Sequence, residues 1–503
     1  MKIFLSITGR FFALMPRSFS SGICKAIGFL IIYVPNSRAR VAFSNIKHCF
    51  PNLPKSEIRE IAYESAKRMV EMGLFVLASP YIGEKELKKR IRISEFLNSE
   101  IAKLQENPRP LVLMIPHFCM MESITMLPML SPLKMPQTGV FYRPFDNDGI
   151  ESWVKETRER YGVHLLSRKD GLFAANDFLK NKGCVGVLFD QDAGAAGALS
   201  PFFGRLASTS EIAEILAHRW RSGVAVVWAK RTGFWSAEID GEFIEGSESE
   251  EILFNLNLWL ENKIKSDETA RRDWLWLHKR WKTQTHPKYR FQIRHRRVVF
   301  EEYLKHFNLK ELPRRSNFIF KMPSELTEAV SVLPIFSTLR KARPDAAFTL
   351  LFNEDIAECF EGLSVAERVL SLPFDAAKRK DVLMSLSEEY PELLAVFDAS
   401  GRYEFDAKLI RAAQSYGFFK KGGKKPKFVK FCAELSEDDF SRPILERVEI
   451  MLKNYGLKEP LDFSEITFKN RNGGAVFDAK KLLKSASKEE IASLLKNSSK
   501  IAF

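Results

Sequence analysis

Between residues 111 and about 245, short apolar runs alternate with longer segments in which apolar residues recur every three or four positions. Short apolar runs are typical of buried strands, and the spacing of three or four is typical of helices that pack on a sheet. The strand-like runs are 111–115, 139–143, 163–167, 184–190, 224–230 and 234–241, and the helix-like segments are 149–161, 171–182 and 208–220. This alternation predicts an α/β layer fold with a mostly parallel sheet.

The chain before this region has the pattern of helices. Residues 36–105 are expected to be helical throughout, because apolar residues recur there at helical spacing, most clearly in 56–78. A serine opens that stretch, as expected for a helix start.

The first 35 residues are rich in Phe, Leu and Ile but are interrupted by Arg10, Arg17 and Lys25. No window reaches the roughly 20 uninterrupted apolar residues that a membrane-spanning helix needs, and no small-residue cleavage site indicates a signal peptide. We expect one or two amphipathic helices in the membrane interface, with the basic residues toward the lipid headgroups. A weak single span and a hydrophobic helical cap on the next domain are the alternatives.

The pattern changes again after Glu301. Residues 318–352 read as strand, loop, helix and strand, which is the opening of a Rossmann-like unit. Residues 420–430 are strongly basic, and we expect a loop there followed by helices. Because the chain is too long for one core, we divide it into a membrane-associating segment 1–35, an α/β domain 36–300 and an accessory α/β domain 301–503.

The composition restricts the partners. The 503 residues carry a formal net charge of +14, which implies a negatively charged partner: nucleic acid, an anionic membrane, an acidic protein or a phosphate-bearing substrate. Charge alone does not choose among them. The six cysteines are scattered without a Cys-x-x-Cys pair, so neither a zinc site nor a disulfide framework is indicated.

A histidine and an acid follow the first strand-like run. That run is closed by Pro116, so His117 lies at the carboxyl edge of a strand, where open α/β sheets bind ligands. Residues five apart lie about 140° apart on a straight helix, so we expect His117 in the turn and Glu122 in the first turn of the next helix. The Glu122 carboxylate then reaches one ring nitrogen. The other nitrogen is left as a general base for a hydroxyl that attacks a carbonyl.

The spacing of this pair is weak evidence by itself. With eight histidines and 63 acidic residues in the chain, about one His-x4-Asp/Glu match is expected by chance. A second match, His306 with Glu311, has no strand before it. The alternative for His117 is an ordinary hydrogen-bonded histidine in a turn, so its context has to decide.

That context resembles the bacterial lipid A late acyltransferases, which belong to the lysophospholipid-acyltransferase-like group and carry the His-x4-Asp/Glu motif. The similarity extends from about Gly28 to Thr283 and rests on ordered blocks at 45–51, 115–123, 140–147, 167–171, 188–194, 201–204 and 276–283. The resemblance implies that residues 36–300 form an acyltransferase domain, in which His117 is the base and Glu122 orients it.

Further polar residues follow other strand-like runs. Arg143 is always charged and suits a phosphate or the oxyanion of a tetrahedral intermediate; a surface salt bridge is the alternative, and the family's matching arginine favours function. Arg168 and Lys169 are expected to hold phosphate or backbone. Asp190 and Asp192 are too few ligands for a divalent metal. The family's matching acidic pair indicates that they orient Arg143 or close the site.

Aromatic residues suggest two apolar features. Phe202 and Phe203 lie in a Pro-Phe-Phe-Gly turn, for which a wall of an apolar tunnel and a packed loop are equally supported. Residues 271–297 hold ten Lys or Arg against one acid, interleaved with Trp, Tyr and Phe. This mixture fits nucleic acid or a membrane-interface belt. The resemblance decides for the membrane, with anionic headgroups or an acidic carrier protein as partner and no nucleic acid.

Our leading hypothesis is an acyltransferase at the cytoplasmic face of the bacterial inner membrane. It moves a fatty acyl chain from an acyl carrier protein thioester to a hydroxyl of a lipid A precursor. Neither a metal nor an organic cofactor is expected, because a thioester is already activated. One alternative keeps the chemistry with a glycerol phosphate or another glycolipid as acceptor. Another is a non-catalytic membrane-binding or nucleic-acid-binding protein, against which His117 and Glu122 count.

Residues 318–430 resemble the N-terminal half of the heptosyltransferase group of glycosyltransferases. Where that group has Gly-Asp in its first loop, this chain has Thr327 and Glu328, and only about 70 residues remain for a nucleotide-sugar-binding lobe. We therefore expect a degenerate accessory domain that docks or guides the acceptor, without sugar transfer.

Overall fold

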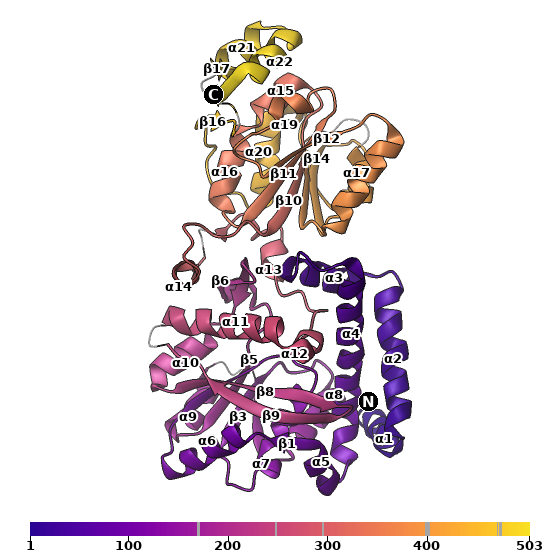
Figure 1. Cartoon of the computed structure of the whole chain (residues 1–503), viewed down its shortest axis with the longest axis vertical. Helices are drawn as coiled ribbons and strands as arrows, with labels where there is room; N and C mark the ends of the chain where they lie inside the picture. Colours follow the sequence, from indigo (N-terminus) through magenta and orange to yellow (C-terminus); the bar gives the residue numbers. More distant parts are fainter. Residues whose placement is uncertain (168–171, 247–248, 294–295, 398–402, 470, 472–474) are drawn as a thin grey trace. The chain divides into compact units, whose positions relative to one another are not determined.

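The computed structural model describes the chain except for residues 168–171, 247–248, 294–295, 398–402, 470 and 472–474. The chain forms two compact units (Figure 1). Unit 1 contains Met1–Phe203, Ala207–Arg280 and Val299–Tyr303, and unit 2 contains Gly204–Leu206, Trp281–Val298 and Leu304–Phe503. Short pieces of the chain from before residue 300 therefore pack within the C-terminal unit.

Unit 1 begins with the helices α1 (Lys2–Leu14), α2 (Arg17–Tyr33), α3 (Ser37–Cys49) and α4 (Lys55–Ala78). Both α1 and α2 pack along α4. Gly9 allows the close approach of α1, because a Cβ there would lie 2.2 Å from the Leu77 carbonyl oxygen. None of the described helices can cross a bilayer alone, although α2 and α3 together satisfy length and composition across a bend of 83°. Helices predicted in residues 36–105 are present, but β1 (Ile91–Ile93) lies among them as a strand of the sheet, so the prediction that this stretch is helical throughout is wrong there.

Seven strands of the described residues form the sheet of unit 1, in the order β1-β9-β8-β2-β5-β3-β4. Neighbouring strands are parallel except β8 and β9, which are antiparallel. The strands are β1 (Ile91–Ile93), β2 (Leu111–Ile115), β3 (Thr138–Tyr142), β4 (Val163–Ser167), β5 (Cys184–Leu188), β8 (Gly223–Gly233) and β9 (Ser236–Phe243). The prediction of a mostly parallel α/β layer is confirmed.

Helices cover both faces of this sheet. Figure 1 shows α10 and α11 on one face and α6 and α7 on the other. The helices that follow α4 in unit 1 include α5 (Glu84–Arg90), α6 (Glu95–Glu106), η2 (Met121–Met126), α7 (Leu127–Leu130), α8 (Asp148–Glu159), α9 (Phe173–Lys180), α10 (Ile212–Trp220), α11 (Ser249–Ser266) and α12 (Glu268–Asp273). With both faces covered, β2 and β5 are buried, which explains their nearly continuous apolar sequences.

A separate hairpin joins β6 (Ala198–Phe202) to β7 (Arg205–Thr209). Its turn consists of Phe203 and Gly204, with φ of 51° and 73°. Positive φ at both central residues is the pattern of a type I′ turn, which suits the twist of a two-residue hairpin. The Pro-Phe-Phe-Gly sequence is thus the tip of a hairpin.

Six described strands of unit 2 form a parallel sheet in the order β12-β11-β10-β13-β14-β15. Counted along the chain, this is the order 3-2-1-4-5-6 of the Rossmann fold. The strands are β10 (Ser316–Lys321), β11 (Ala346–Asn353), β12 (Arg368–Leu372), β13 (Leu393–Val396), β14 (Gln414–Lys420) and β15 (Phe431–Leu435). The helices among them are α15 (Leu326–Ser331), α16 (Pro334–Ala342), α17 (Ala376–Glu388) and α18 (Tyr403–Ile410). The Rossmann-like prediction is confirmed.

The basic stretch is a loop at residues 421–430, as predicted, but strands as well as helices follow it. The basic stretch leads into β15, and a small sheet in the order β16-β18-β17 follows within the described residues. Its elements are β16 (Ile466–Thr467), β17 (Ala475–Asp478) and β18 (Ser498–Ala502), accompanied by α19 (Glu437–Ser441), α20 (Ile444–Asn454), α21 (Ala479–Ser485) and α22 (Lys488–Asn497). With two and four residues, β16 and β17 hold too few for an apolar alternation to be recognised.

We expect a large loss of stability when the ion pair of Arg205 and Glu392 is broken. The two side chains lie within unit 2, are each 4% exposed and approach to 2.6 Å. Glu392→Ala leaves a buried guanidinium without its carboxylate, which costs about 3–5 kcal/mol of unfolding free energy. Urea unfolding measures the loss. Glu465→Ala, which breaks an exposed pair with Lys500, is the control and should cost about 1 kcal/mol or less. Equal losses would contradict the expectation.

Candidate active site

His117 follows Pro116 at the carboxyl end of β2, and its side chain is 9% exposed. Its backbone N–H donates to Oδ2 of Asp190 at 2.9 Å, and its Nδ1 lies 2.5 Å from Oδ1 of the same carboxylate. Asp190 lies two residues beyond β5, which pairs with β2 in parallel. Because the carboxyl ends of parallel neighbours meet at one edge, an acid 73 positions later in the chain holds the histidine at two points.

Asp190 is buried, and its charge is satisfied by hydrogen-bond donors. The Trp274 indole donates its Nε1–H to Oδ2 at 2.7 Å. Burial alone would raise the pKa of Asp190, but the His117 ring and the hydrogen bonds from His117 and Trp274 outweigh it and lower the pKa. An ionised Asp190 keeps the proton on Nδ1 of His117, so that Nε2 carries the lone pair that a general base uses.

The second ring nitrogen of His117 also has a partner. Nε2 of His117 lies 2.9 Å from Nε2 of Gln191, the residue after Asp190. Since Nδ1 of the neutral ring carries the proton, Nε2 is the acceptor and the Gln191 amide is the donor.

Glu122 lies elsewhere than predicted. It is in η2, in the first turn of the next helix as expected, but its carboxylate accepts two hydrogen bonds from Arg158 of α8. The distances are 2.8 Å from Nε to Oε1 and 2.9 Å from Nη2 to Oε2. The predicted contact between Glu122 and the His117 ring is therefore wrong. A bidentate guanidinium pair offers this buried carboxylate two charge-assisted hydrogen bonds at once.

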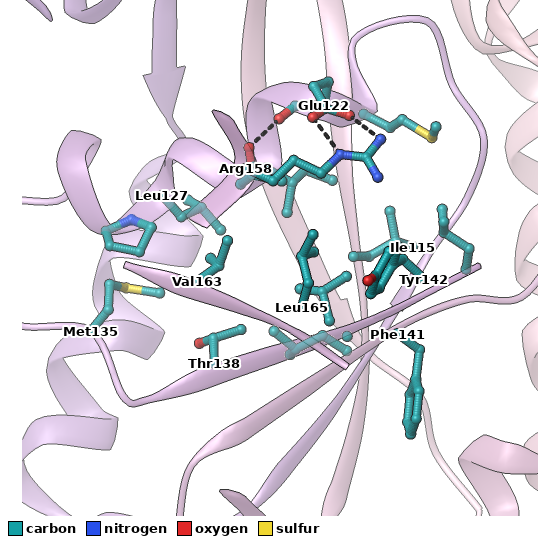
Figure 2. Close-up of a pocket in the computed structure, with 18 residues that line it drawn as sticks. Ile115, Glu122, Leu127, Met135, Thr138, Phe141, Tyr142, Arg158, Val163 and Leu165 are labelled. Carbon is teal, nitrogen blue, oxygen red and sulfur yellow. Dashed lines mark hydrogen bonds and ion pairs between the residues drawn. The ribbon is translucent and has the colours of Figure 1, made fainter. Parts of the chain in front are cut away.

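Figure 2 shows Glu122 and Arg158 at one side of a pocket whose other walls are mainly apolar. The pocket has a volume of about 70 Å³ and lies between η2, α7, α8 and the strands β2 to β5. Its apolar lining includes Leu113, Ile115, Met121, Ile124, Leu127, Met135, Val140, Phe141, Val163, Leu165 and Leu188. Ile115 and Leu188 end the strands β2 and β5, two residues before His117 and Asp190, so the pocket reaches the sheet edge at which the histidine lies, although neither His117 nor Asp190 lines it.

Arg143 is the first residue after β3 and is exposed. Since β3 pairs with β5, Arg143 lies at the same sheet edge as His117, two strands away or roughly 10 Å. The predicted orientation of Arg143 by Asp190 is not seen, and the described hydrogen bonds of Asp190 join it to His117 and Trp274 instead. Arg168 and Lys169 lie outside the described residues.

Phe202 and Phe203 are buried in the hairpin tip. Phe202 packs edge-on against Trp274 at 5.6 Å, and Phe203 against Phe50 at 5.7 Å. This packing agrees with the alternative of a packed loop. The hairpin therefore supports Trp274, which donates a hydrogen bond to Asp190.

Asn45 of α3 brings two of the family-like blocks together. Its Nδ2 donates to the carbonyl oxygens of Trp276 at 2.9 Å and His278 at 2.8 Å. His278 in turn accepts the backbone N–H of Asp192 on Nε2 at 3.2 Å. Burial lowers the pKa of His278 to about 4. Our sequence analysis gave Asn45, His278 and Arg158 no role. Asn45 and His278 lie in sequence blocks that resemble the acyltransferase family, and this could have indicated them.

No group of three or more His, Cys, Asp or Glu side chains in the described part of the chain is arranged to hold a metal ion.

A parallel α/β sheet with a buried His–Asp pair at its carboxyl edge, next to an apolar pocket, defines an α/β domain suited to activating a hydroxyl in apolar surroundings. Residues 2–283 match the sequence profile of the bacterial lipid A biosynthesis acyltransferases, and the chain belongs to this family. It is therefore an acyltransferase of lipid A biosynthesis, a class of membrane-associated enzymes that use an acyl donor and a lipid acceptor.

Two known proteins illustrate how far the similarity extends. A lipid A biosynthesis acyltransferase of Haemophilus influenzae is 26% identical over 268 residues, which are 51% of this chain and 81% of that protein. A crystal structure of a family 9 glycosyl transferase from Veillonella parvula DSM 2008 aligns with 33% of this chain and 53% of that chain, at 11% identity and a TM-score of 0.26. An alignment this loose carries no argument, and the Rossmann order of unit 2 rests on its own strand pairing.

We expect His278 to make stability depend on pH. Its pKa of about 4 in the folded chain lies below the usual value of 6.5, so between these values the unfolded chain binds more protons. Stability is therefore complete above about pH 6.5 and falls as the pH drops toward 4, by at most about 3 kcal/mol. Urea unfolding from pH 7.5 to 4.5 measures the slope. His278→Gln should flatten it, and an unchanged slope would contradict this assignment.

We also expect Glu122 and Arg158 to be coupled. Glu122→Leu leaves the Arg158 charge half-buried beside an apolar pocket and should cost about 2–4 kcal/mol of unfolding free energy. Replacing both residues with leucine should recover part of that loss, because no unpaired charge remains. A double-mutant cycle in urea measures the coupling, and additive losses would refute it.

Proposed function

We propose that this protein transfers a fatty acyl chain from an acyl carrier protein thioester to a hydroxyl of a lipid A precursor, at the cytoplasmic face of the inner membrane. The observation that carries the proposal is the His117–Asp190 pair, set beside an apolar pocket in a chain of the lipid A acyltransferase family.

The geometry supports a base-catalysed acyl transfer. Nε2 of His117 takes the proton of the acceptor hydroxyl while the hydroxyl oxygen forms a bond to the thioester carbonyl carbon. The resulting tetrahedral oxyanion collapses, the carbon–sulfur bond breaks, and the thiolate leaves with the proton from His117. Asp190 stabilises the imidazolium between these steps and keeps the ring oriented.

The pocket supports a role in holding the acyl chain. Its walls are apolar except at Glu122 and Arg158 and a few polar edges, and it starts at the strand ends that carry His117 and Asp190. At about 70 Å³ it is half the size of an engineered cavity of about 150 Å³ that holds benzene. A long acyl chain therefore requires its lining side chains to move. In this proposal Glu122 and Arg158 shape the pocket.

The N-terminal helices support attachment to the membrane. Along α1 and α2 the exposed side chains include Ile3, Phe4, Ile7, Phe11, Leu14, Phe19, Ile27, Phe29, Leu30 and Tyr33. The same helices expose Arg10, Arg17 and Lys25. Apolar residues with flanking cations suit the boundary between acyl chains and anionic headgroups. The net charge of +14 also favours an acidic carrier protein as donor.

The assay also tests two alternative functions. The same site would serve a glycerol phosphate or another glycolipid as acceptor. A non-catalytic membrane-binding protein would not need the hydrogen-bonded His117 and Asp190. For unit 2 we propose docking or guiding of the acceptor without sugar transfer. Glu328, the candidate for a sugar-transfer base, is ion-paired with Arg447 at 3.3 Å.

The test measures lipid products by mass spectrometry after incubation with acyl carrier protein thioesters or acyl-coenzyme A and different acceptors. His117→Ala should lower the rate roughly 10²–10⁴-fold, because the general base is lost. Asp190→Asn should also be impaired, since an amide cannot stabilise the imidazolium. His306→Ala, at the exposed chance match, should have the wild-type rate. Wild-type turnover by a folded His117→Ala protein would reject the mechanism.

A further inference from the structure

The nitrogen of His117 that acts as base is occupied in this structure. Nε2 of His117 accepts the hydrogen bond of the Gln191 amide at 2.9 Å. An imidazole nitrogen has one lone pair in the ring plane, so it cannot accept from Gln191 and from a substrate hydroxyl at the same time. The acceptor lipid has to displace the Gln191 amide before its hydroxyl can give up a proton.

Gln191 is built to let its side chain move while its backbone stays in place. It directly follows Asp190, which is held by His117 and Trp274. Its carbonyl oxygen accepts from Nη1 of Arg280 at 3.4 Å, and the same guanidinium donates to Ser208 at 2.7 Å. The Gln191 side chain itself is only half-buried and has three rotatable bonds. The amide can therefore turn about a fixed Cα.

The displaced amide remains close to the reacting atoms. The attacking oxygen hydrogen-bonds to Nε2 of His117 at about 2.8 Å, which is nearly the position the amide now has. The thioester carbonyl oxygen becomes an oxyanion two bonds from that attacking oxygen. An N–H donor roughly 3 Å from the developing oxyanion is what such an intermediate requires. A short rotation of Gln191 would supply it.

We propose that Gln191 is a catalytic residue with two successive roles. Before the acceptor binds, its amide covers the base nitrogen of His117. When the acceptor hydroxyl takes that place, the amide donates an N–H to the oxyanion of the tetrahedral intermediate. No further reactant is needed, because the amide exchanges its hydrogen bond to His117 for one to the oxyanion. The inference rests on the proposed acyl transfer and names a further group in the same site.

Two of the arginines near the site are already hydrogen-bonded to other residues, and a third lies farther from His117. Arg158 is held by both oxygens of Glu122, and buried Arg280 donates to Ser208 and Thr209. Arg143 is exposed two strands away from β2 at the same edge. Gln191 touches the base nitrogen directly, so an amide is the donor that the geometry favours, and Arg143→Met serves as the comparison.

The experiment compares Gln191→Leu and Gln191→Glu with the wild type in the full-length protein. The donor is a saturated fatty-acyl thioester of acyl carrier protein, and the acceptor is a lipid A precursor with a free hydroxyl. We expect kcat to fall about 10²-fold in both variants, the usual effect of losing one oxyanion donor, while KM for the acceptor does not rise. Gln105→Leu, at an exposed glutamine of α6, should leave kcat unchanged.

Thermal midpoints and the split between kcat and KM separate catalysis from structural support. Native-like thermal midpoints with reduced kcat and a KM for the acceptor that does not rise support the inference. A kcat within threefold of wild type, or a loss of kcat that follows the thermal midpoint, overturns it. If Gln191→Leu fails to fold, Gln191→Glu gives the same decision on kcat. Absence of transfer by the wild type would instead refute the proposed function.

Discussion

The candidate site depends on one carboxylate shared between two parallel strands. Asp190, beyond β5, accepts the backbone N–H and the ring N–H of His117, beyond β2, and the indole of Trp274 donates to the same carboxylate. A buried carboxylate is tolerated only when its charge is met by donors. Here three donors from two segments of the chain meet it. The tautomer of His117, its orientation and the lone pair on Nε2 all follow from this arrangement.

The same arrangement separates the two acids near the histidine. Asp190 orients the ring, whereas Glu122 of the His-x4-Glu motif pairs with Arg158 at the edge of the apolar pocket. A charge pair placed there fixes the relation between η2 and α8, which form two walls of the pocket. Base and pocket can therefore respond to different substitutions, although the motif joins them within six residues of sequence.

The layers outside the site follow from ordinary packing. Asn45 donates to the backbone carbonyls of Trp276 and His278, and Ser65 donates to that of Trp274. Helices α3 and α4 therefore hold the segment that supports Asp190. In unit 2, the six-stranded sheet has the strand order of a Rossmann fold, and its core includes Phe318, Phe320 and Phe348. Both units bury their sheets on two faces, as parallel sheets require.

By itself, the sequence determined the elements whose signal is local. The apolar runs that became β2, β3, β4 and β5 and the helices between them were predictable, because burial imposes a period on each segment. It also placed His117 at a strand end and Glu122 in the following helix turn. The short strands β16 and β17 lacked enough residues to show a period.

Only the tertiary structure decided the partners. Asp190 meets His117 because β5 lies beside β2, and Arg158 meets Glu122 because α8 packs beside η2. These pairs are separated by 73 and 36 positions. Strand order and helix packing arise from the folded core as a whole, so no spacing in the sequence specifies which acid reaches the histidine. The local sequence fixes where a side chain stands on its element, and the fold decides what it touches.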